Sequence, residues 1–304
     1  MGERRSPLQR DILKGFLVLK KVILYIISCC CFFQPASVFS WNALGHRLIA
    51  QIAYDQLKPR TIRILNRYNH AVDKGYKPMR LVDSAVWLDY VKYQHKDTYS
   101  AMHYIDLSFS EDGTALPPLS DVNAVTAIEQ ALHTLEQANM SDYNKGIALR
   151  ILLHVVGDIH QPLHATSQVS RRYPDGDRGG NDVALAKNPI AKNLHSYWDN
   201  GAGYLKINTK KKHAPSLKKM ATELEHNYPC NRFSLETNPS QWAKESHEFG
   251  VGAYQTLYHT IPDRDYQFRS ISIVKKRIAM AGCRLAALLN HLAENNVYTR
   301  FRSF

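Results

Sequence analysis

Residues 154–164 read HVVGDIHQPLH and hold three histidines and one aspartate within eleven positions. His154 and Asp158 are four residues apart, so on a helix they project from one face, one turn apart. Pro162 ends that helix, and His164 turns back toward the same point from the following loop. Two imidazoles and a carboxylate that converge in this way are typical zinc ligands. The alternative is a helix end whose histidines are simply hydrogen-bonded.

The segment that leads into this stretch, NKGIALRILLHVVGD at residues 144–158, is strongly apolar and predicts a central, buried helix. A carboxylate and an imidazole buried at the end of such a helix are costly unless they are paired or bind a metal. The burial expected here therefore favours the metal interpretation.

Apolar residues recur at helical spacing in several further segments. We predict helices after Gly45, over 60–70, over 81–94, from a cap at Ser120 or Asp121 to residue 138, over 193–200, over 238–260 and over 270–296. Residues 100–108 read as irregular or extended, and residues 165–182 read as a polar loop. The basic run at 205–219 reads as a solvated face or loop, with a phosphate site as its alternative. No stretch shows the alternation of a β-hairpin. The sequence thus predicts one mainly α-helical domain over residues 41–304.

Residues 1–40 are expected to be a signal peptide and not part of the fold. A basic lead precedes an apolar run, VILYIISCCCFF at 22–33, which is too short for a comfortable membrane span. Val38 and Ser40 stand three residues and one residue before a possible cleavage site that would leave Trp41 as the first residue. We therefore expect a secreted or periplasmic protein without a stable membrane anchor.

Charge and cysteine content narrow the class of partner and compartment. The net charge is +12, and it remains +8 without the first 40 residues, which favours anionic partners such as nucleic acid or phospholipid without choosing between them. Outside the signal segment the cysteines are Cys230 and Cys283, for which a single disulfide is expected after export. Two separate buried thiols are the alternative. A rival interpretation of the signal segment is a lipoprotein signal with Cys29 lipidated.

Six motifs together resemble a known family. They are W-x4-H at 41–46, WLD at 87–89, HYID at 103–106, HVVGDIHQPLH at 154–164, GGN at 179–181 and LHSYWD at 194–199. This combination resembles the zinc-dependent single-strand nucleases of the mung-bean-nuclease type, which share a helical fold with bacterial phospholipase C. The order and spacing match, and the closing helix extends the resemblance over nearly the whole chain after residue 40. The resemblance implies a single compact helical domain of the phospholipase C/nuclease type with a trinuclear zinc cleft.

By this resemblance, nine residues hold three zinc ions. The first ion takes Asp89, His103, His154 and Asp158, the second takes His164, His195 and Asp199, and the third takes His46, Asp158 and Trp41. Trp41 would bind through its α-amino nitrogen and carbonyl oxygen, which requires cleavage of the chain directly before it. His160 matches no ligand position, so we expect it to have a structural role or to contact the ligands.

The resemblance also assigns residues around the phosphate and the base. Lys92, three residues after Asp89, matches the basic residue that contacts the scissile phosphate, and an ordinary surface lysine is the alternative. Tyr104 takes the position of an aromatic ring for the base, with core packing as its alternative, and Asp106 matches the residue that hydrogen-bonds the base edge. Stacking on an aromatic ring needs an unstacked base, which favours single strands.

The sequence thus predicts an exported, monomeric, zinc-dependent endonuclease that cleaves single-stranded RNA and DNA to 5′-phosphate products and also acts on 3′-nucleotides. Clustered divalent ions supply hydroxide at neutral pH, neutralise charge and activate the leaving oxygen. Asp89, Lys92 and Asp158 are the expected catalytic residues. The alternatives are a phospholipase C acting on phosphatidylcholine-type lipids and a zinc-binding protein without turnover.

Overall fold

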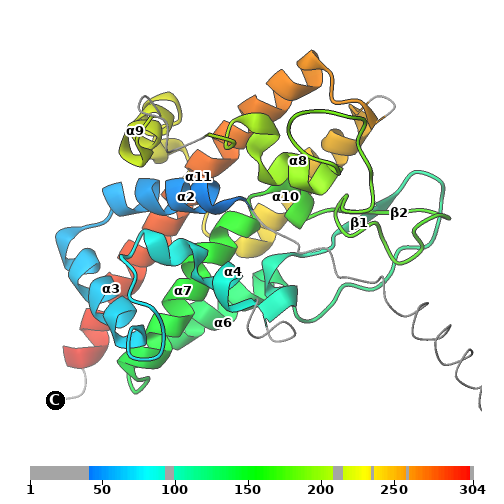
Figure 1. Cartoon of the computed structure of the whole chain (residues 1–304). Helices are drawn as coiled ribbons and strands as arrows, with labels where there is room; N and C mark the ends of the chain where they lie inside the picture. Colours follow the sequence, from blue (N-terminus) through cyan, green and yellow to red (C-terminus); the bar gives the residue numbers. More distant parts are fainter. Residues whose placement is uncertain (1–40, 93–98, 208–214, 234–235, 258–259, 302–304) are drawn as a thin grey trace, which may run out of the picture. The chain divides into compact units, whose positions relative to one another are not determined.

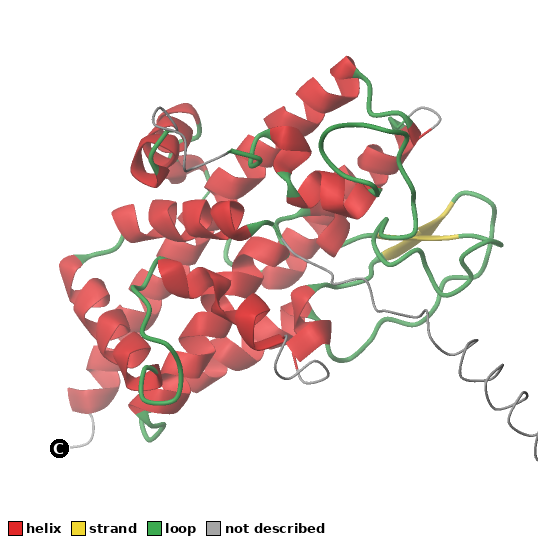
Figure 2. Cartoon of the chain, viewed as in Figure 1, coloured by secondary structure: helices red, strands yellow, loops and turns green. Residues whose placement is uncertain are grey.

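The computed structural model describes residues 41–92, 99–207, 215–233, 236–257 and 260–301, and they form a helical fold (Figures 1 and 2). The predicted mainly α-helical class is confirmed. The α-helices are α2 (Ala43–Asp55), α3 (Pro59–Val72), α4 (Trp87–Lys92), α6 (Ala124–Glu136), α7 (Asp142–Asp158), α8 (Leu194–Asp199), α9 (Leu217–Asn227), α10 (Pro239–Gln255) and α11 (Arg264–Phe301). Single 3-10 turns are η1 (Asp83–Val86), η2 (Ser100–His103), η3 (Pro162–His164), η4 (Gly201–Gly203) and η5 (Cys230–Arg232).

Helix α7 is the central helix, as predicted. Its side chains are buried on nearly every face, and α2, α3, α6 and α11 all pack against it. The helix begins after Ser141, whose side chain accepts a hydrogen bond from the backbone N–H of Asn144. Figure 1 shows α7 in green in the middle of the described fold, with α11 running behind it. The carboxyl end of α7 is therefore enclosed by other elements, and this end carries His154 and Asp158.

Two predicted helix starts are wrong by a few residues. Helix α2 begins at Ala43, because the Asn42 side chain accepts hydrogen bonds from two N–H groups of the first turn, so His46 lies inside the helix and not before it. Helix α6 is capped by Asn123, whose side chain pairs with Thr126 in a capping box, and not by Ser120 or Asp121.

Helix α9 was not predicted, and α11 is longer than predicted. The basic run was expected to continue as a loop or solvated face to residue 219, but Ser216 caps a helix from Leu217 whose buried side chains include Met220 and Leu224. This apolar spacing was hidden by the charge of the preceding residues. Helix α11 begins at Arg264 instead of residue 270.

The described residues also contain a short pair of parallel strands, β1 (Ser108–Ser110) and β2 (Ser167–Val169), shown in yellow in Figure 2. The strands bring the segment after η2 beside the segment after η3. Since η2 ends at His103 and η3 ends at His164, this pairing holds two predicted ligands near each other.

The predicted disulfide between Cys230 and Cys283 is confirmed, and it ties η5 to α11. Among the described helices, none combines the length and the apolar character that a membrane crossing requires.

Candidate metal centre

The last turn of α7 places His154 and Asp158 on one face, as their spacing predicts. Both side chains are fully buried, and His154 Nε2 lies 3.4 Å from Asp158 Oδ2. The other ring nitrogen, His154 Nδ1, lies 2.6 Å from the carbonyl oxygen of Ala85. Because a carbonyl only accepts, Nδ1 carries the proton in the neutral ring, which leaves Nε2 as an acceptor on the side of the carboxylate.

Two further ligands reach this point from η2 and α4. His103 Nδ1 lies 3.1 Å from Asp158 Oδ2 and 3.1 Å from His154 Nε2. Asp89 Oδ1 lies 3.7 Å from His154 Nε2 and 4.0 Å from His103 Nδ1. This Asp89 oxygen is buried and receives no hydrogen bond from the described residues. A buried carboxylate oxygen in that state is stabilised by a cation.

His46 approaches the same cluster from α2. Its ring stacks on that of His154, with centroids 3.9 Å apart and planes 13° apart, and its Nε2 lies 3.4 Å from Asp158 Oδ1. Burial, and then the nearby His154 and His164, lower the pKa of His46 well below 6.5, so the ring is neutral at pH 7. Asp158 therefore directs one oxygen at His46 and the other at His103 and His154, which is the arrangement expected of a carboxylate that bridges two metals.

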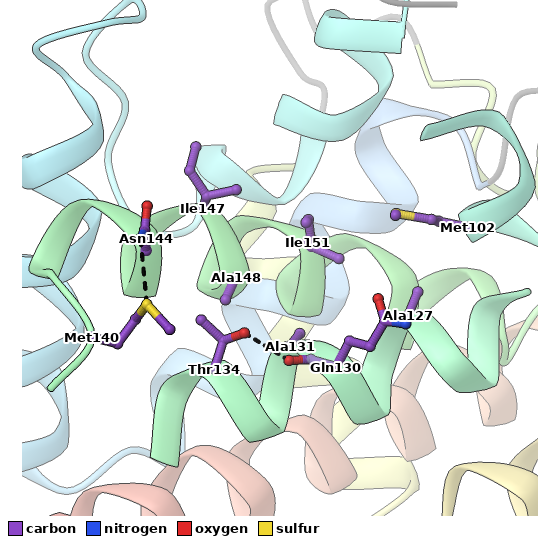
Figure 3. Close-up of a pocket in the computed structure, with 10 residues that line it drawn as sticks. All are labelled: Met102, Ala127, Gln130, Ala131, Thr134, Met140, Asn144, Ile147, Ala148 and Ile151. Atoms are coloured by element: carbon purple, nitrogen blue, oxygen red, sulfur yellow. Dashed lines mark hydrogen bonds between the residues drawn. The ribbon is translucent and has the colours of Figure 1, made fainter. Parts of the chain in front are cut away.

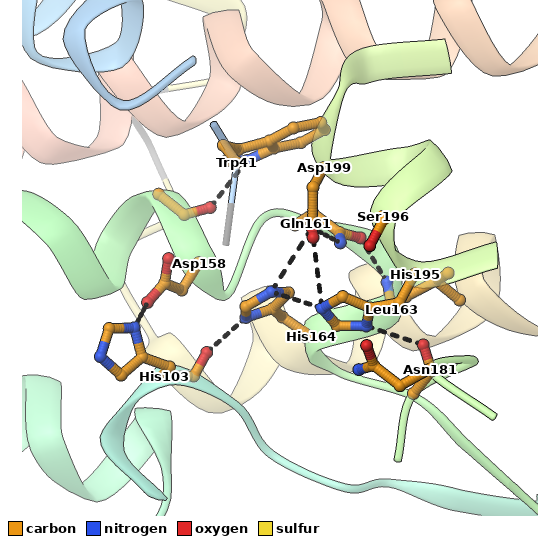
Figure 4. Close-up of polar contacts among 12 residues, drawn as sticks. Trp41, His103, Asp158, Gln161, Leu163, His164, Asn181, His195, Ser196 and Asp199 are labelled. Atoms are coloured by element: carbon orange, nitrogen blue, oxygen red, sulfur yellow. Dashed lines mark hydrogen bonds and ion pairs between the residues drawn. The ribbon is translucent and has the colours of Figure 1, made fainter. Parts of the chain in front are cut away.

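A second group forms where η3 meets α8 (Figure 4). His164 Nε2 and His195 Nε2 lie 3.1 Å apart, and Asp199 lies beside both, 3.7 Å from the first ring and 3.6 Å from the second. His164 Nδ1 lies 2.6 Å from the carbonyl oxygen of His103, and His195 Nδ1 lies 2.8 Å from that of Gly179. Both Nδ1 atoms must therefore carry the proton in the neutral rings.

The tautomer of His164 and His195 determines what their contact means. With both Nδ1 atoms protonated, the Nε2 atoms of His164 and His195 are acceptors that face each other at 3.1 Å. Two lone pairs that face each other at this distance repel. A metal cation that takes both lone pairs removes the repulsion. The contact between these rings thus fits a metal ion.

The donor set as a whole fits zinc. The eight His and Asp side chains fall into three groups that could each hold an ion: His46, Asp89 and His154; His103, His154 and Asp158; and His164, His195 and Asp199. Imidazole nitrogen and carboxylate oxygen are the usual zinc ligands, and three protein ligands leave a position open for catalysis. The last group is the set expected for the second ion. The first two overlap at His154, so the structure merges the sets expected for the first and third ions into one cluster.

A polar pocket opens beside the cluster. Tyr104 and Asp106 line it together with Ser108, Pro117, Asn123 and Asp175, and its volume is about 140 Å³. Although part of Asp106 is exposed, loss of water contact in the pocket and then the charge of Asp177 raise the pKa of its carboxyl to about 6. Burial and the charge of Asp106 raise the pKa of the Tyr104 hydroxyl. The pocket therefore offers a ring and a carboxyl close to the ligand His103.

The larger groove between α6 and α7 is a different kind of surface (Figure 3). Its volume is about 320 Å³, and aliphatic side chains such as Ala131, Ile147 and Ile151 line much of it. None of the eight candidate ligands lines this groove. The groove therefore lies apart from the candidate metal site, which is the His/Asp cluster.

Comparison with known proteins gives the family. The family model described as S1/P1 Nuclease matches residues 41–294. The chain belongs to the S1/P1 nuclease family. This nuclease is 28% identical to Endonuclease 1 of Arabidopsis thaliana over 89% of its own length and 92% of that protein. It is 25% identical to Nuclease P1 of Penicillium citrinum, over 83% and 97%, and 24% identical to Nuclease S1 of Aspergillus oryzae, over 84% and 92%.

The family result establishes the enzyme class. Family membership and these relatives make the protein a hydrolytic nuclease whose substrates are nucleic acids, and they do not favour the phospholipase alternative.

Two glycines of the nuclease allow backbone to approach the ligands. Gly179 has a φ of 62°, and a Cβ there would clash with the carbonyl oxygen of Leu163 and lie 3.2 Å from His195 Nδ1. A Cβ at Gly157 would lie 2.9 Å from His46 Nδ1. The GGN motif thus has a physical role: it brings the Gly179 carbonyl close enough to fix the tautomer of His195.

Gln161 was not singled out in the sequence, yet it touches a candidate ligand. The side chain is fully buried, and its Nε2 donates a hydrogen bond of 2.8 Å to Asp199 Oδ1. Its Oε1 accepts a hydrogen bond of 2.6 Å from the backbone N–H of Leu163. This second bond fixes which end of the amide faces Asp199. Gln161 therefore orients Asp199, and only the tertiary fold reveals this.

The ring nitrogens of His160 bond to residues outside the His/Asp cluster. Its Nδ1 bonds to the carbonyl oxygen of Val156 at 2.8 Å, and its Nε2 accepts from Arg284 at 3.0 Å. Burial, followed by the charges of Arg277 and Arg284, lowers its pKa well below 6.5. Of the two expected alternatives, the structure supports the structural role.

The structure describes the side chain of Trp41 but not that of Lys92, the two predicted site residues that remain. Trp41 is fully buried, and its indole N–H donates to the carbonyl oxygen of Gly157 at 3.0 Å (Figure 4). The next residue, Asn42, donates its backbone N–H to the carbonyl oxygen of Asp199 at 3.0 Å. The start of the described chain therefore lies against both ligand groups. Lys92 is the last residue of α4, and its side chain lies outside the described part of the structure.

Proposed function

We propose that this nuclease is an exported, zinc-dependent endonuclease that hydrolyses single-stranded RNA and DNA to 5′-phosphate products, and that it also removes phosphate from 3′-nucleotides. The observation that carries the proposal is the facing pair of Nε2 atoms on His164 and His195, 3.1 Å apart, within a buried cluster of eight His and Asp side chains. Membership of the S1/P1 nuclease family supports the same chemistry.

We assign three zinc ions to the cluster. Asp89, His103, His154 and Asp158 would hold the first, His164, His195 and Asp199 the second, and His46, Asp158 and the α-amino nitrogen and carbonyl oxygen of Trp41 the third. When bound, such ions lower the pKa of water, neutralise the phosphodiester and stabilise the leaving oxygen. The two Asp158 oxygens, which face different histidines, suit a bridging role.

The chain's own residues would bind and orient the substrate. Lys92 stands one turn after Asp89 on α4, where its charge would contact the scissile phosphate. Tyr104 would stack on the base next to that phosphate, and Asp106 would bond to the base edge. Because stacking on Tyr104 requires an unpaired and unstacked base, this pocket selects single strands.

Export and cleavage before Trp41 complete the proposal. The match to the family begins at residue 41, and the sequence before it has the basic lead, apolar run and small residues of a signal peptide. A chain cut there has a free amino group on Trp41, beside the carboxyl end of α7. The protein would then work in a secreted or periplasmic compartment, where its disulfide is stable.

The test is cleavage of single-stranded RNA by the chain that begins at Trp41, with and without a chelator, followed by identification of the products. We expect chelator-sensitive release of 5′-mononucleotides and much slower cleavage of duplex RNA. Phosphatidylcholine serves as the comparison substrate, because a phospholipase C would act on it and would leave RNA intact. Bound zinc without turnover of either substrate would instead support a binding protein.

A further inference from the structure

A second polar pocket lies beside α4, the helix that carries Asp89. It has a volume of about 370 Å³ and is lined by Asp73, Lys74, Gly75, Tyr76 and Lys77 from the segment after α3, and by Tyr90 from α4. None of the candidate metal ligands lines it. We call it the Tyr90 pocket.

Its position follows from the geometry of α4. Asp89 and Tyr90 are neighbours on this helix, so their Cα atoms are about 3.8 Å apart and their side chains diverge by about 100° around the axis. Asp89 points to the metal cluster, and Tyr90 is 54% exposed and faces the pocket. The Tyr90 pocket thus opens on one face of a helix whose other face supplies a metal ligand.

The two aromatic side chains of the pocket differ in exposure. The Tyr76 ring packs edge-on against the buried Trp87, with centroids 5.2 Å apart and planes 86° apart, which fixes its position. Tyr90 lies largely in solvent. A single exposed aromatic is ordinary on a protein surface. Both tyrosines line one concave site, where an aromatic ring is available for stacking on a base.

The charge of the pocket is positive. Lys74 and Lys77 are both exposed. The carboxylate in the pocket, Asp73, is held by Arg150 at 2.8 Å, so its negative charge is compensated. Aromatic rings combined with free cationic side chains bind single-stranded nucleic acid, because bases stack on the rings while phosphates pair with the lysines.

We propose that the Tyr90 pocket binds a nucleotide of the substrate strand that lies outside the cleaved linkage. Tyr90 and Tyr76 stack on its base, and Lys74 and Lys77 contact the flanking phosphates. The nuclease therefore prefers longer single strands over dinucleotides and 3′-mononucleotides, which have no nucleotide beyond the cleaved linkage. The inference rests on the proposed single-strand nuclease activity and adds a binding site to it.

The test compares substrates of increasing length. We expect Tyr90→Ala to lower kcat/KM on a twelve-nucleotide single strand about tenfold and to leave hydrolysis of a dinucleotide and of a 3′-mononucleotide unchanged. Phe268→Ala is the matched control, since Phe268 is 58% exposed on α11 and does not line the pocket. An equal loss on all substrates, or no loss on the twelve-mer, would overturn the proposal.

The lysines give a second and independent readout. In the Lys74→Ala/Lys77→Ala double variant, the slope of log affinity against log salt should fall by about 1.4 for two lost contacts to a single strand. The control is Lys219→Ala/Lys276→Ala, which removes two exposed lysines from α9 and α11. An unchanged slope in the Lys74→Ala/Lys77→Ala variant would contradict the proposal.

Direct binding separates failure of this inference from failure of the proposed function. The intact enzyme is titrated with a hydrolysis-resistant phosphorothioate twelve-mer and trimer. Wild type without activity on any single strand would refute the proposed function. Normal activity combined with equal affinity for the twelve-mer in wild type and Tyr90→Ala would refute only the Tyr90 pocket.

Discussion

Two buried clusters of ionisable side chains flank the turn that follows α7, and their polar atoms are satisfied in opposite ways. On one side, His164 and His195 face each other with acceptor nitrogens beside Asp199. On the other side, Arg277 and Arg284 direct their N–H groups at acceptors, among them the Glu245 carboxylate. The first cluster offers its acceptor atoms to a metal ion, whereas the second already contains its cations.

The difference shows how one motif supplies both a candidate metal ligand and a structural residue. His160 Nε2 receives a hydrogen bond from Arg284, while His164 Nε2, four residues later, faces the acceptor nitrogen of His195. Both rings are fully buried. The two histidines share burial and residue type, so they differ in the group that faces Nε2. A donor faces Nε2 of the structural His160, and an acceptor faces Nε2 of the candidate ligand His164.

The largest expected effect is on the metal side. Asp158→Asn should lower kcat/KM on single-stranded RNA about 1000-fold, because an amide cannot bridge two metals through two anionic oxygens. Asp142→Asn, on a partly exposed residue at the other end of the same helix, is the control and should retain activity. An Asp158→Asn enzyme with a tenth of wild-type activity would show that the reaction occurs elsewhere.

A substitution in the arginine cluster should lower the stability of the protein and leave its metal content unchanged. Arg284→Met removes one of the two buried arginines that pair with Glu245, and it leaves the buried His160 Nε2 without its donor. It should lower the free energy of unfolding by about 3 kcal/mol while zinc content is retained. Arg67→Met breaks an exposed pair with Asp142 and should cost at most about 1 kcal/mol. Denaturant titration measures both, and equal losses in the two variants would contradict the comparison.

A smaller effect is expected from the residue that orients a ligand. Gln161→Met keeps the length of the side chain but removes the hydrogen bond to Asp199, so the affinity of the second metal group should fall roughly 10- to 100-fold. Competition with a zinc-binding dye measures this affinity. Gln56→Met, at an exposed glutamine that bonds to Glu225, is the control. Unchanged zinc affinity in Gln161→Met would remove its assigned role.

The smallest effect concerns pH. The pKa of His160 is lowered in the folded protein, so below pH 6.5 the unfolded chain takes up a proton there that the folded chain does not. Wild type should therefore lose up to about 1.4 kcal/mol of stability per pH unit from this residue as pH falls below 6.5.

The variant His160→Gln keeps an acceptor for Arg284 but does not titrate. The ligand histidines contribute equally to both proteins, so the difference between them isolates His160. Thermal unfolding between pH 6.5 and 5 should show a shallower loss for the variant. Identical pH dependence would mean that folded His160 is protonated like an exposed histidine.

Most of the candidate-site features that the sequence predicted follow from the spacing of residues close together in the chain. His154 with Asp158, and His195 with Asp199, converge because four residues make one helical turn, and the structure places each pair on a helix. The contacts of Gln161 depend on segments that are distant in sequence, so no local pattern reveals them. Helix α9 was missed because its apolar spacing directly follows a basic run.

The central claim is that the facing acceptors of the His/Asp cluster hold zinc. Native mass spectrometry of the chain that begins at Trp41, purified in the presence of zinc, tests it most directly. We predict three zinc ions per chain, and we predict that removing them with a chelator lowers the melting temperature. A folded protein that retains no zinc, and whose melting temperature does not change with zinc or chelator, would contradict the claim.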